Sequence, residues 1–145
     1  MIKQRYQSII VQTICSLLVP FIQLFALYVI VHGHYGPGGG FQGGVLLAVS
    51  IILQRLYLGA EVSYQKFSPK LALAIAAIGM LIFGLAGIVP MVTGGAFLDY
   101  AYLPIPWVHG AELRALGILI VEIGIGLAVF GTLVLIFDSL VGERW

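Results

Sequence analysis

The chain has 145 residues, of which 61% are hydrophobic and only 9% are charged, and its formal net charge is +1. Soluble domains carry about 25% charged residues, so this composition predicts an all-α integral membrane protein, with the lipid bilayer as its solvent. The near-neutral charge, without a cluster of Lys and Arg, argues against nucleic-acid binding. Cys15 is the only cysteine, which leaves neither a disulfide framework nor a cysteine metal cluster within the chain.

Four apolar windows are long enough, or nearly so, to cross a bilayer, which takes about 20 apolar residues per helix. The first window is too long for the core of a signal peptide, so we expect it to be mature structure. We therefore predict a single membrane domain over residues 1–145, with four transmembrane helices at about 8–31, 41–58, 70–92 and 115–137.

The first window contains a proline and a glutamine at mid-depth. Pro20 lacks a backbone donor and frees the carbonyl of Ser16, so we predict a helix kink at this position. Gln23 brings a polar amide into the same helix. A structural kink explains these residues better than a role in transport.

Between the first two windows, residues 32–44 read HGHYGPGGGFQGG. The spacing of Gly38, Gly40 and Gly43 matches that of a dinucleotide-binding turn. That turn, however, needs a preceding strand, a following soluble helix and an acidic residue about 20 positions further on. The apolar surroundings of the segment exclude this interpretation.

The second window has a short apolar core, so we expect the glycine segment to enter the membrane as a broken or re-entrant segment. Such backbone is tolerated only where it is buried in protein or faces a water-filled cavity. Pro37 prevents a simple helix, and the glycines permit close approach of another chain. Two interpretations stay open: a packed hinge, or an ion path in which His34 relays protons.

Small residues recur at helix-packing spacing in the last two windows, as close contact between membrane helices requires. With only four helices, we expect some of the contacting helices to belong to other subunits, although a self-contained bundle could use the same stripes. The residues are Gly117, Gly124 and Gly131 in the fourth window and Ala72, Ala76, Gly79 and Ala86 in the third.

Glu122 lies seven residues into the predicted fourth helix, roughly 10 Å inside its outer boundary at 1.5 Å per residue. A carboxylate at that depth is costly unless it is paired, hydrated or protonated. Glu122 is therefore a candidate for an ion path, and a neutral Glu bonded to a neighbouring helix is the alternative. Asp138 ends the last helix, where we expect it to be solvated.

Basic residues near the helix ends predict the orientation, because cytoplasmic loops are enriched in Lys and Arg. Arg114 falls on one side, and six basic residues share the other, which predicts that both termini are cytoplasmic. The connection over residues 93–114 is then an outer, ordered loop with Trp107 as an aromatic anchor. The six residues are Lys3, Arg5, Arg55, Lys66, Lys70 and Arg144.

No pattern of residues indicates catalysis by this chain alone. There is no Ser/His/Asp constellation, paired-carboxylate site or P-loop lysine in the sequence. His32 and His34 are only two potential ligands, without a cysteine or a nearby acidic residue to complete a metal site. We therefore predict no catalytic residue, no metal site and no cofactor bound by this chain.

The string GHYGPGGGFQGG resembles the G-H-N-x-P-G-G-G-F-x-G-G signature of the B subunit of Mrp-type multisubunit Na⁺/H⁺ antiporters. This family includes the B-like subunits of membrane-bound hydrogenase and sulfane reductase complexes. Tyr35 departs from the usual Asn, and Ala115 stands where several members have an acidic residue. Glu122 is not part of the motif. The matching positions are Gly33, His34, Pro37, Gly38, Gly39, Gly40, Phe41, Gly43 and Gly44.

The resemblance implies a noncatalytic subunit of a cation/proton antiporter module in a prokaryotic cytoplasmic membrane. It implies Na⁺ and H⁺ as transported ions and other membrane subunits as partners, in a stand-alone Mrp antiporter or in a membrane-bound hydrogenase-like respiratory complex. A purely structural assembly subunit is the main alternative. An autonomous small transporter is disfavoured, since the chain has no obvious inverted repeat.

Overall fold

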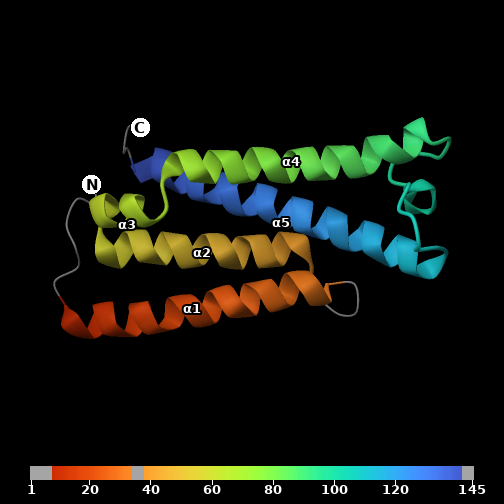
Figure 1. Cartoon of the computed structure of the whole chain (residues 1–145). Helices are drawn as coiled ribbons and strands as arrows, with labels where there is room; N and C mark the ends of the chain where they lie inside the picture. Colours follow the sequence, from red (N-terminus) through yellow and green to blue (C-terminus); the bar gives the residue numbers. More distant parts are fainter. Residues whose placement is uncertain (1–7, 34–37, 142–145) are drawn as a thin grey trace.

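The computed structural model describes residues 8–33 and 38–141 of the chain, and these residues form helices and their connections. Four of the helices are long and apolar enough to cross a membrane, which confirms the predicted number for the described part of the chain (Figure 1). The elements are α1 (Ile9–His32), α2 (Gly40–Leu58), α3 (Ala60–Lys66), α4 (Pro69–Val92), the 3₁₀ turn η1 (Tyr100–Tyr102) and α5 (Ala111–Val141).

Two features of the helices differ from the sequence-based expectations. α5 has 31 residues and extends four residues beyond each predicted end. At 1.5 Å per residue it is about 46 Å long, which exceeds the roughly 30 Å of a hydrocarbon core. The short helix α3 was not predicted, and it begins after Gly59, whose φ of 83° glycine adopts without strain.

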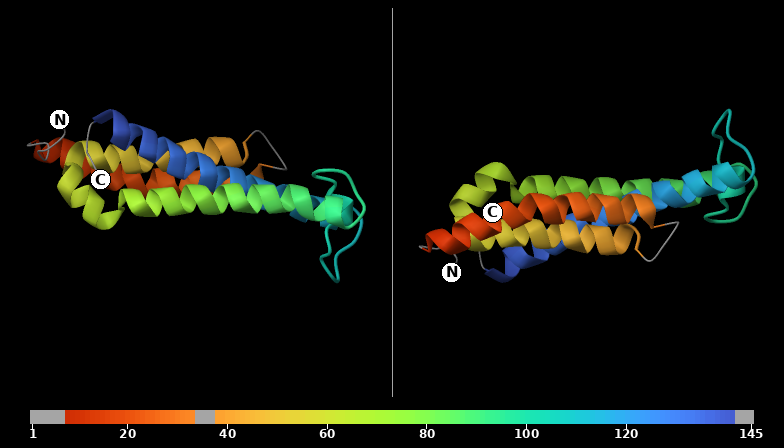
Figure 2. Two further views of the ribbon diagram at one scale, coloured as in Figure 1. Left: turned by 90° about the horizontal axis from the view of Figure 1, so that it is seen from above. Right: turned by 90° about the horizontal axis from the view of Figure 1, so that it is seen from below.

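The four long helices are arranged in the order α1, α2, α5, α4. α2 contacts both α1 and α5, and α5 contacts both α2 and α4. α1 and α4 therefore lie at opposite edges of the bundle (Figure 1). Seen from above and below, the helices run along one common direction, and the α4–α5 connection extends furthest at one end (Figure 2).

The contact between α4 and α5 depends on small residues. A Cβ atom at Gly79 would overlap the backbone of Ala128, and one at Gly131 would overlap the carbonyl of Ala72. The predicted small-residue stripes thus pack against each other within this chain. A side-chain cluster of α2, α4 and α5 residues continues this contact toward α3: Ala48, Ile51, Ala72, Phe130 and Val134.

α1 is a continuous helix through Pro20, whose side chain is exposed, and the kink at this residue stays a prediction. The amide of Gln23 donates a hydrogen bond to the hydroxyl of Ser50 on α2, with 3.2 Å between the two heavy atoms. That hydroxyl in turn donates to the carbonyl of Leu47 at 2.7 Å. Gln23 therefore links α1 to α2.

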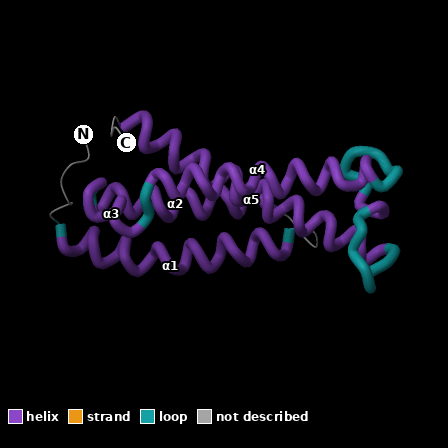
Figure 3. The backbone as a smooth tube through the Cα atoms, turned by 45° about the horizontal axis from the view of Figure 1, so that its top comes forward, coloured by secondary structure: helices purple, strands orange, loops and turns teal. Residues whose placement is uncertain are grey.

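The connection between α4 and α5 is a loop at one end of the bundle (Figure 3). Several of its own side chains hold it in place. The Thr93 hydroxyl donates to the carbonyl of Tyr102 at 2.6 Å. Gly87 and Gly117 leave room for the rings of Phe97 and Tyr100, respectively. Trp107 is 93% exposed, as an aromatic side chain that anchors in a membrane interface needs to be.

Candidate functional site

The glycine segment joins the end of α1 to the start of α2. Gly39 caps α2 with a φ of 123°, a conformation that residues with a Cβ atom rarely adopt. Residues 34–37 lie outside the described residues, and His34 and Pro37 are among them. The roles proposed for these two residues therefore stay predictions.

The glycines at the start of α2 allow backbone contact with two other helices. A Cβ atom at Gly40 would overlap the carbonyl of Glu122 on α5. One turn further on, a Cβ atom at Gly44 would lie 2.5 Å from the carbonyl oxygen of Gly126, one turn after Glu122. A Cβ atom at Gly43, on the α1 side, would lie 2.9 Å from the carbonyl oxygen of Ala26. Close packing thus requires glycine at these three positions.

The side chain of Glu122 points to the junction between α1 and α2. Its Oε1 atom would lie 2.5 Å from a Cβ atom built on Gly33 and 3.1 Å from one built on Gly39. Its Oε2 atom is buried and has no hydrogen-bond partner among the residues that the structure describes. The sequence suggested Glu122 and the glycine segment separately, and the structure brings them together.

The carboxylate of Glu122 lies beside the beginning of a helix. The N-terminus of a helix carries a partial positive charge, and α2 begins beside this carboxylate. No group of three or more His, Cys, Asp or Glu side chains that could hold a metal ion occurs in the described part of the chain. A cation at Glu122 would therefore need backbone oxygens, water or another chain to complete its coordination.

Phe41 differs from its neighbours in the glycine segment because its side chain faces outward. The side chain is 62% exposed, whereas Gly40, Gly43 and Gly44 are buried. Phe41 is thus available to lipid or to a neighbouring subunit.

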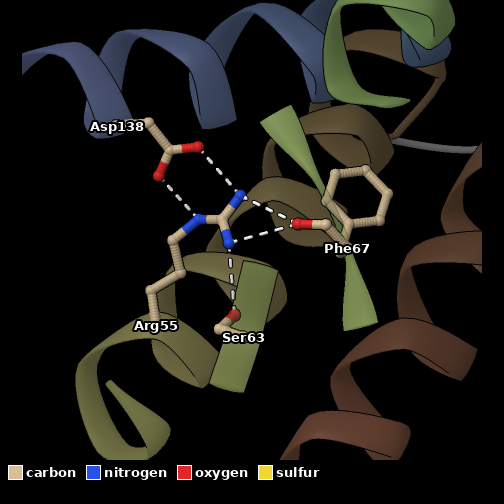
Figure 4. A network of polar contacts seen from close by, with 4 residues as sticks. All are labelled: Arg55, Ser63, Phe67 and Asp138. Atoms are coloured by element: carbon tan, nitrogen blue, oxygen red, sulfur yellow. Dashed lines mark hydrogen bonds and ion pairs between the residues drawn. The ribbon is translucent and has the colours of Figure 1, made fainter. Parts of the chain in front are cut away.

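A second polar cluster, at the opposite end of α2, was not predicted from the sequence (Figure 4). The Nε atom of Arg55 lies 2.6 Å from Oδ1 of Asp138, and Nη2 donates to Oδ2 at 2.8 Å. The guanidinium also donates to the Ser63 hydroxyl at 3.2 Å and to the Phe67 carbonyl at 3.3 Å. The side chains of Arg55 and Asp138 are only 2% and 1% exposed.

The expectation that Asp138 is solvated at the end of the last helix is therefore wrong. α5 continues to Val141, which leaves Asp138 one turn inside the helix and buried against α2. A signal was present in the sequence, because Asp138 is the next position in the seven-residue series of Gly117, Gly124 and Gly131. A charge on a helix-packing stripe indicates a buried partner.

The comparisons with known proteins agree with this architecture. A family model described as "Domain related to MnhB subunit of Na+/H+ antiporter" matches residues 10–135. The B subunit of the Na⁺/H⁺ antiporter of Bacillus subtilis is 31% identical over 138 residues, which cover 90% of this chain and 96% of that protein. "Putative antiporter subunit mnhB2" of Staphylococcus haemolyticus is 32% identical over 142 residues, covering 97% and 99% of the two chains.

A solved structure is similar over almost the whole chain. It is that of the membrane-bound sulfane sulfur reductase, an archaeal respiratory membrane complex. One of its chains matches with a TM-score of 0.69 and 30% sequence identity over 98% of the present chain, which spans 63% of the length of that chain. Together with the family model, these matches show that the chain belongs to the family of domains related to the MnhB subunit of Na⁺/H⁺ antiporters.

Proposed function

We propose that the chain is a noncatalytic, multi-pass subunit of a Na⁺/H⁺ antiporter module in a prokaryotic cytoplasmic membrane, and that Glu122 and the glycine segment border its ion path. The descriptions of the matching family model and of the Bacillus subtilis subunit, which both name a Na⁺/H⁺ antiporter, support the two ions. The observation that carries the proposed site is the carboxylate of Glu122. Its buried Oε2 atom lacks a partner among the described residues, and its Oε1 atom faces Gly33 and Gly39.

The arrangement of the helices supports a path that other membrane subunits complete. In the described part of the chain, α1 and α4 lie at opposite edges, so the long helices form no closed ring around a channel. A path beside Glu122 is then bounded by this chain on one side and by a partner on the other. That partner belongs to a stand-alone antiporter or to a redox-driven complex similar to the sulfane sulfur reductase.

The charges support an orientation with both termini in the cytoplasm. Lys66 and Lys70 lie at the α3 end of the bundle, whereas Arg114 lies at the other end of α5. Because cytoplasmic ends carry more basic residues, the α3 end faces the cytoplasm. The glycine segment then belongs to the outer half of the membrane.

The depth of Glu122 supports a glycine segment that lies within the membrane. Glu122 lies eleven residues after the start of α5 at Ala111 and seven residues after the start of the apolar window at Ala115, which is roughly 10 Å inside that window at 1.5 Å per residue. The ends of α1 and α2 next to the glycine segment also lie short of the connection between α4 and α5 (Figure 1). Backbone at this depth has to be covered by protein or to face water.

The test is ion exchange by an intact complex that contains Glu122→Gln. Glutamine keeps the size of the side chain and removes the charge. Because intramembrane carboxylates mark ion pathways, we expect Na⁺/H⁺ exchange in membrane vesicles to fall about tenfold, which corresponds to a barrier about 1.4 kcal/mol higher. Glu112→Gln is the matched control, because Glu112 is an exposed carboxylate in the first turn of the same helix. Exchange rates are compared at equal amounts of assembled complex.

A purely structural role is the second candidate, and the backbone contact between Gly40 and Glu122 favours it. In that case Gly40→Leu prevents assembly, while every Glu122 variant that assembles exchanges ions at the wild-type rate. Equal exchange by assembled Glu122→Gln and Glu112→Gln complexes would therefore overturn the ion-path proposal and leave the structural one.

A further inference from the structure

A groove of about 430 Å³ opens between the start of α4 and the end of α5, away from Glu122. This volume falls within the range of roughly 300–1,000 Å³ that is usual for small-molecule sites. The groove lies at the α3 end of the bundle. Its lining residues are Pro69, Lys70, Leu73, Leu135 and Ser139.

The chemistry of the groove changes along its length. Lys70 lies at the start of α4, and Ser139 lies near the end of α5. About one helical turn further into the bundle, each helix contributes a leucine to the groove. Leu73 follows Lys70 on α4, and Leu135 precedes Ser139 on α5. A cation and a hydroxyl thus lie at the membrane-surface end, and apolar side chains lie toward the membrane interior. A phospholipid has the same order of polarity.

The charge at the surface end is positive. Asp138, next to Ser139 in sequence, is buried in its ion pair with Arg55 and does not face the groove as a free carboxylate. The N-terminus of α4 begins at Pro69 and adds a partial positive charge beside Lys70. An anionic headgroup complements this end better than a zwitterionic one.

We propose that this groove binds an anionic phospholipid, with its phosphate at Lys70 and Ser139 and an acyl chain along Leu73 and Leu135. Basic pockets between membrane helices at the cytoplasmic side are known to hold anionic headgroups. The proposal concerns a lipid site and does not depend on the role of Glu122.

The test is lipid binding by the purified full chain in detergent, measured by native mass spectrometry. The probes are phosphatidylglycerol and phosphatidylcholine with identical acyl chains. We expect the chain to retain phosphatidylglycerol in preference to phosphatidylcholine. Lys70→Gln should weaken that binding about fivefold, which corresponds to about 1 kcal/mol for one lysine at an anionic membrane surface.

Two further variants make the test specific for the groove. Lys66→Gln removes an exposed lysine at the same end of the bundle but outside the groove, so binding should stay at the wild-type level. Leu135→Trp fills the apolar part of the groove and should reduce binding of phosphatidylglycerol even though Lys70 remains.

Several results would overturn the proposal. Equal retention of the two lipids would exclude selection for an anionic headgroup. Equal losses in Lys66→Gln and Lys70→Gln would indicate diffuse surface charge, and displacement of the lipid by inorganic phosphate would indicate a site for free phosphate. Cross-linking of Leu73→Cys to another subunit in the intact complex would show that a protein occupies the groove.

Discussion

Gly40 and Glu122 meet backbone to backbone, at the point where the first turn of α2 crosses α5. The contact leaves no room for a Cβ atom on Gly40, because the carbonyl group of Glu122 occupies that space. The same residue of α5 thus sets the distance between two helices with its backbone and directs its carboxylate to the glycine segment with its side chain.

Gly40→Ala should therefore destabilise the bundle strongly. A methyl group at this position meets a backbone carbonyl, which cannot rotate away as a side chain can, so we expect a loss of about 3 kcal/mol, at the upper end of the usual cost of overpacking. Thermal unfolding of the purified chain in detergent measures the change. Gly84→Ala is the control, since a Cβ atom at Gly84 has no neighbour within 4 Å among the described residues. Equal thermal stability of Gly40→Ala and Gly84→Ala would show that Gly40 does not pack closely against the carbonyl of Glu122.

Removing one member of the Arg55–Asp138 pair should lower the free energy of unfolding strongly, whereas replacing both members with apolar residues should lower it much less. Removing one partner leaves a buried charge without compensation, so Arg55→Met and Asp138→Leu should each destabilise the chain by about 3–5 kcal/mol. The double variant, which removes both charges, should be more stable than either single variant. Unfolding of the three variants in detergent forms a double-mutant cycle, and additive losses would show that the two side chains are not coupled.

Gly117→Ala should affect the α4–α5 connection through Tyr100. A Cβ atom at Gly117 would lie 2.5 Å from Cγ of the Tyr100 ring, which has to move to accommodate it. We expect a loss of about 1–3 kcal/mol and faster hydrogen exchange in residues 93–110. In a Tyr100→Ala background, the same substitution at Gly117 should have almost no effect. If Gly117→Ala lowers the stability of the Tyr100→Ala variant by the same amount, the loss does not arise from contact with the Tyr100 ring.

The number and position of the spanning helices followed from the apolar windows, because hydrocarbon thickness fixes the length of such a window. Helix ends are set by other forces. Ser68 caps α4 by accepting a hydrogen bond from the Leu71 amide, and Pro69 occupies the first turn, so this start was easy to predict. α5 begins four residues before the predicted start, because the boundary of an apolar window does not reveal how far a helix continues into polar sequence.

The sequence indicated the individual residues of the Glu122 site, but it did not indicate the pairing of Arg55 with Asp138. The glycines and Glu122 stood out individually, yet their meeting depends on the rotation of α5 about its axis, which only the packing of α2 and α4 determines. Arg55 and Asp138 are separated by 83 positions. The place of Asp138 near the end of an apolar window predicts a solvated side chain, whereas its place on the glycine stripe predicts a buried one.

The packing contact of Gly40 with Glu122 and the ion pair of Arg55 with Asp138 together restrict how α2 and α5 can move. Gly40 and Arg55 are fifteen residues apart on α2, and their partners Glu122 and Asp138 are sixteen residues apart on α5, so both helices span about 22–24 Å between the same two contacts. Sliding one helix past the other by a single turn would break both contacts at once. α2 and α5 should therefore move together as one rigid body. Any motion that accompanies transport should then occur in α1, in α4 and in the adjoining subunits.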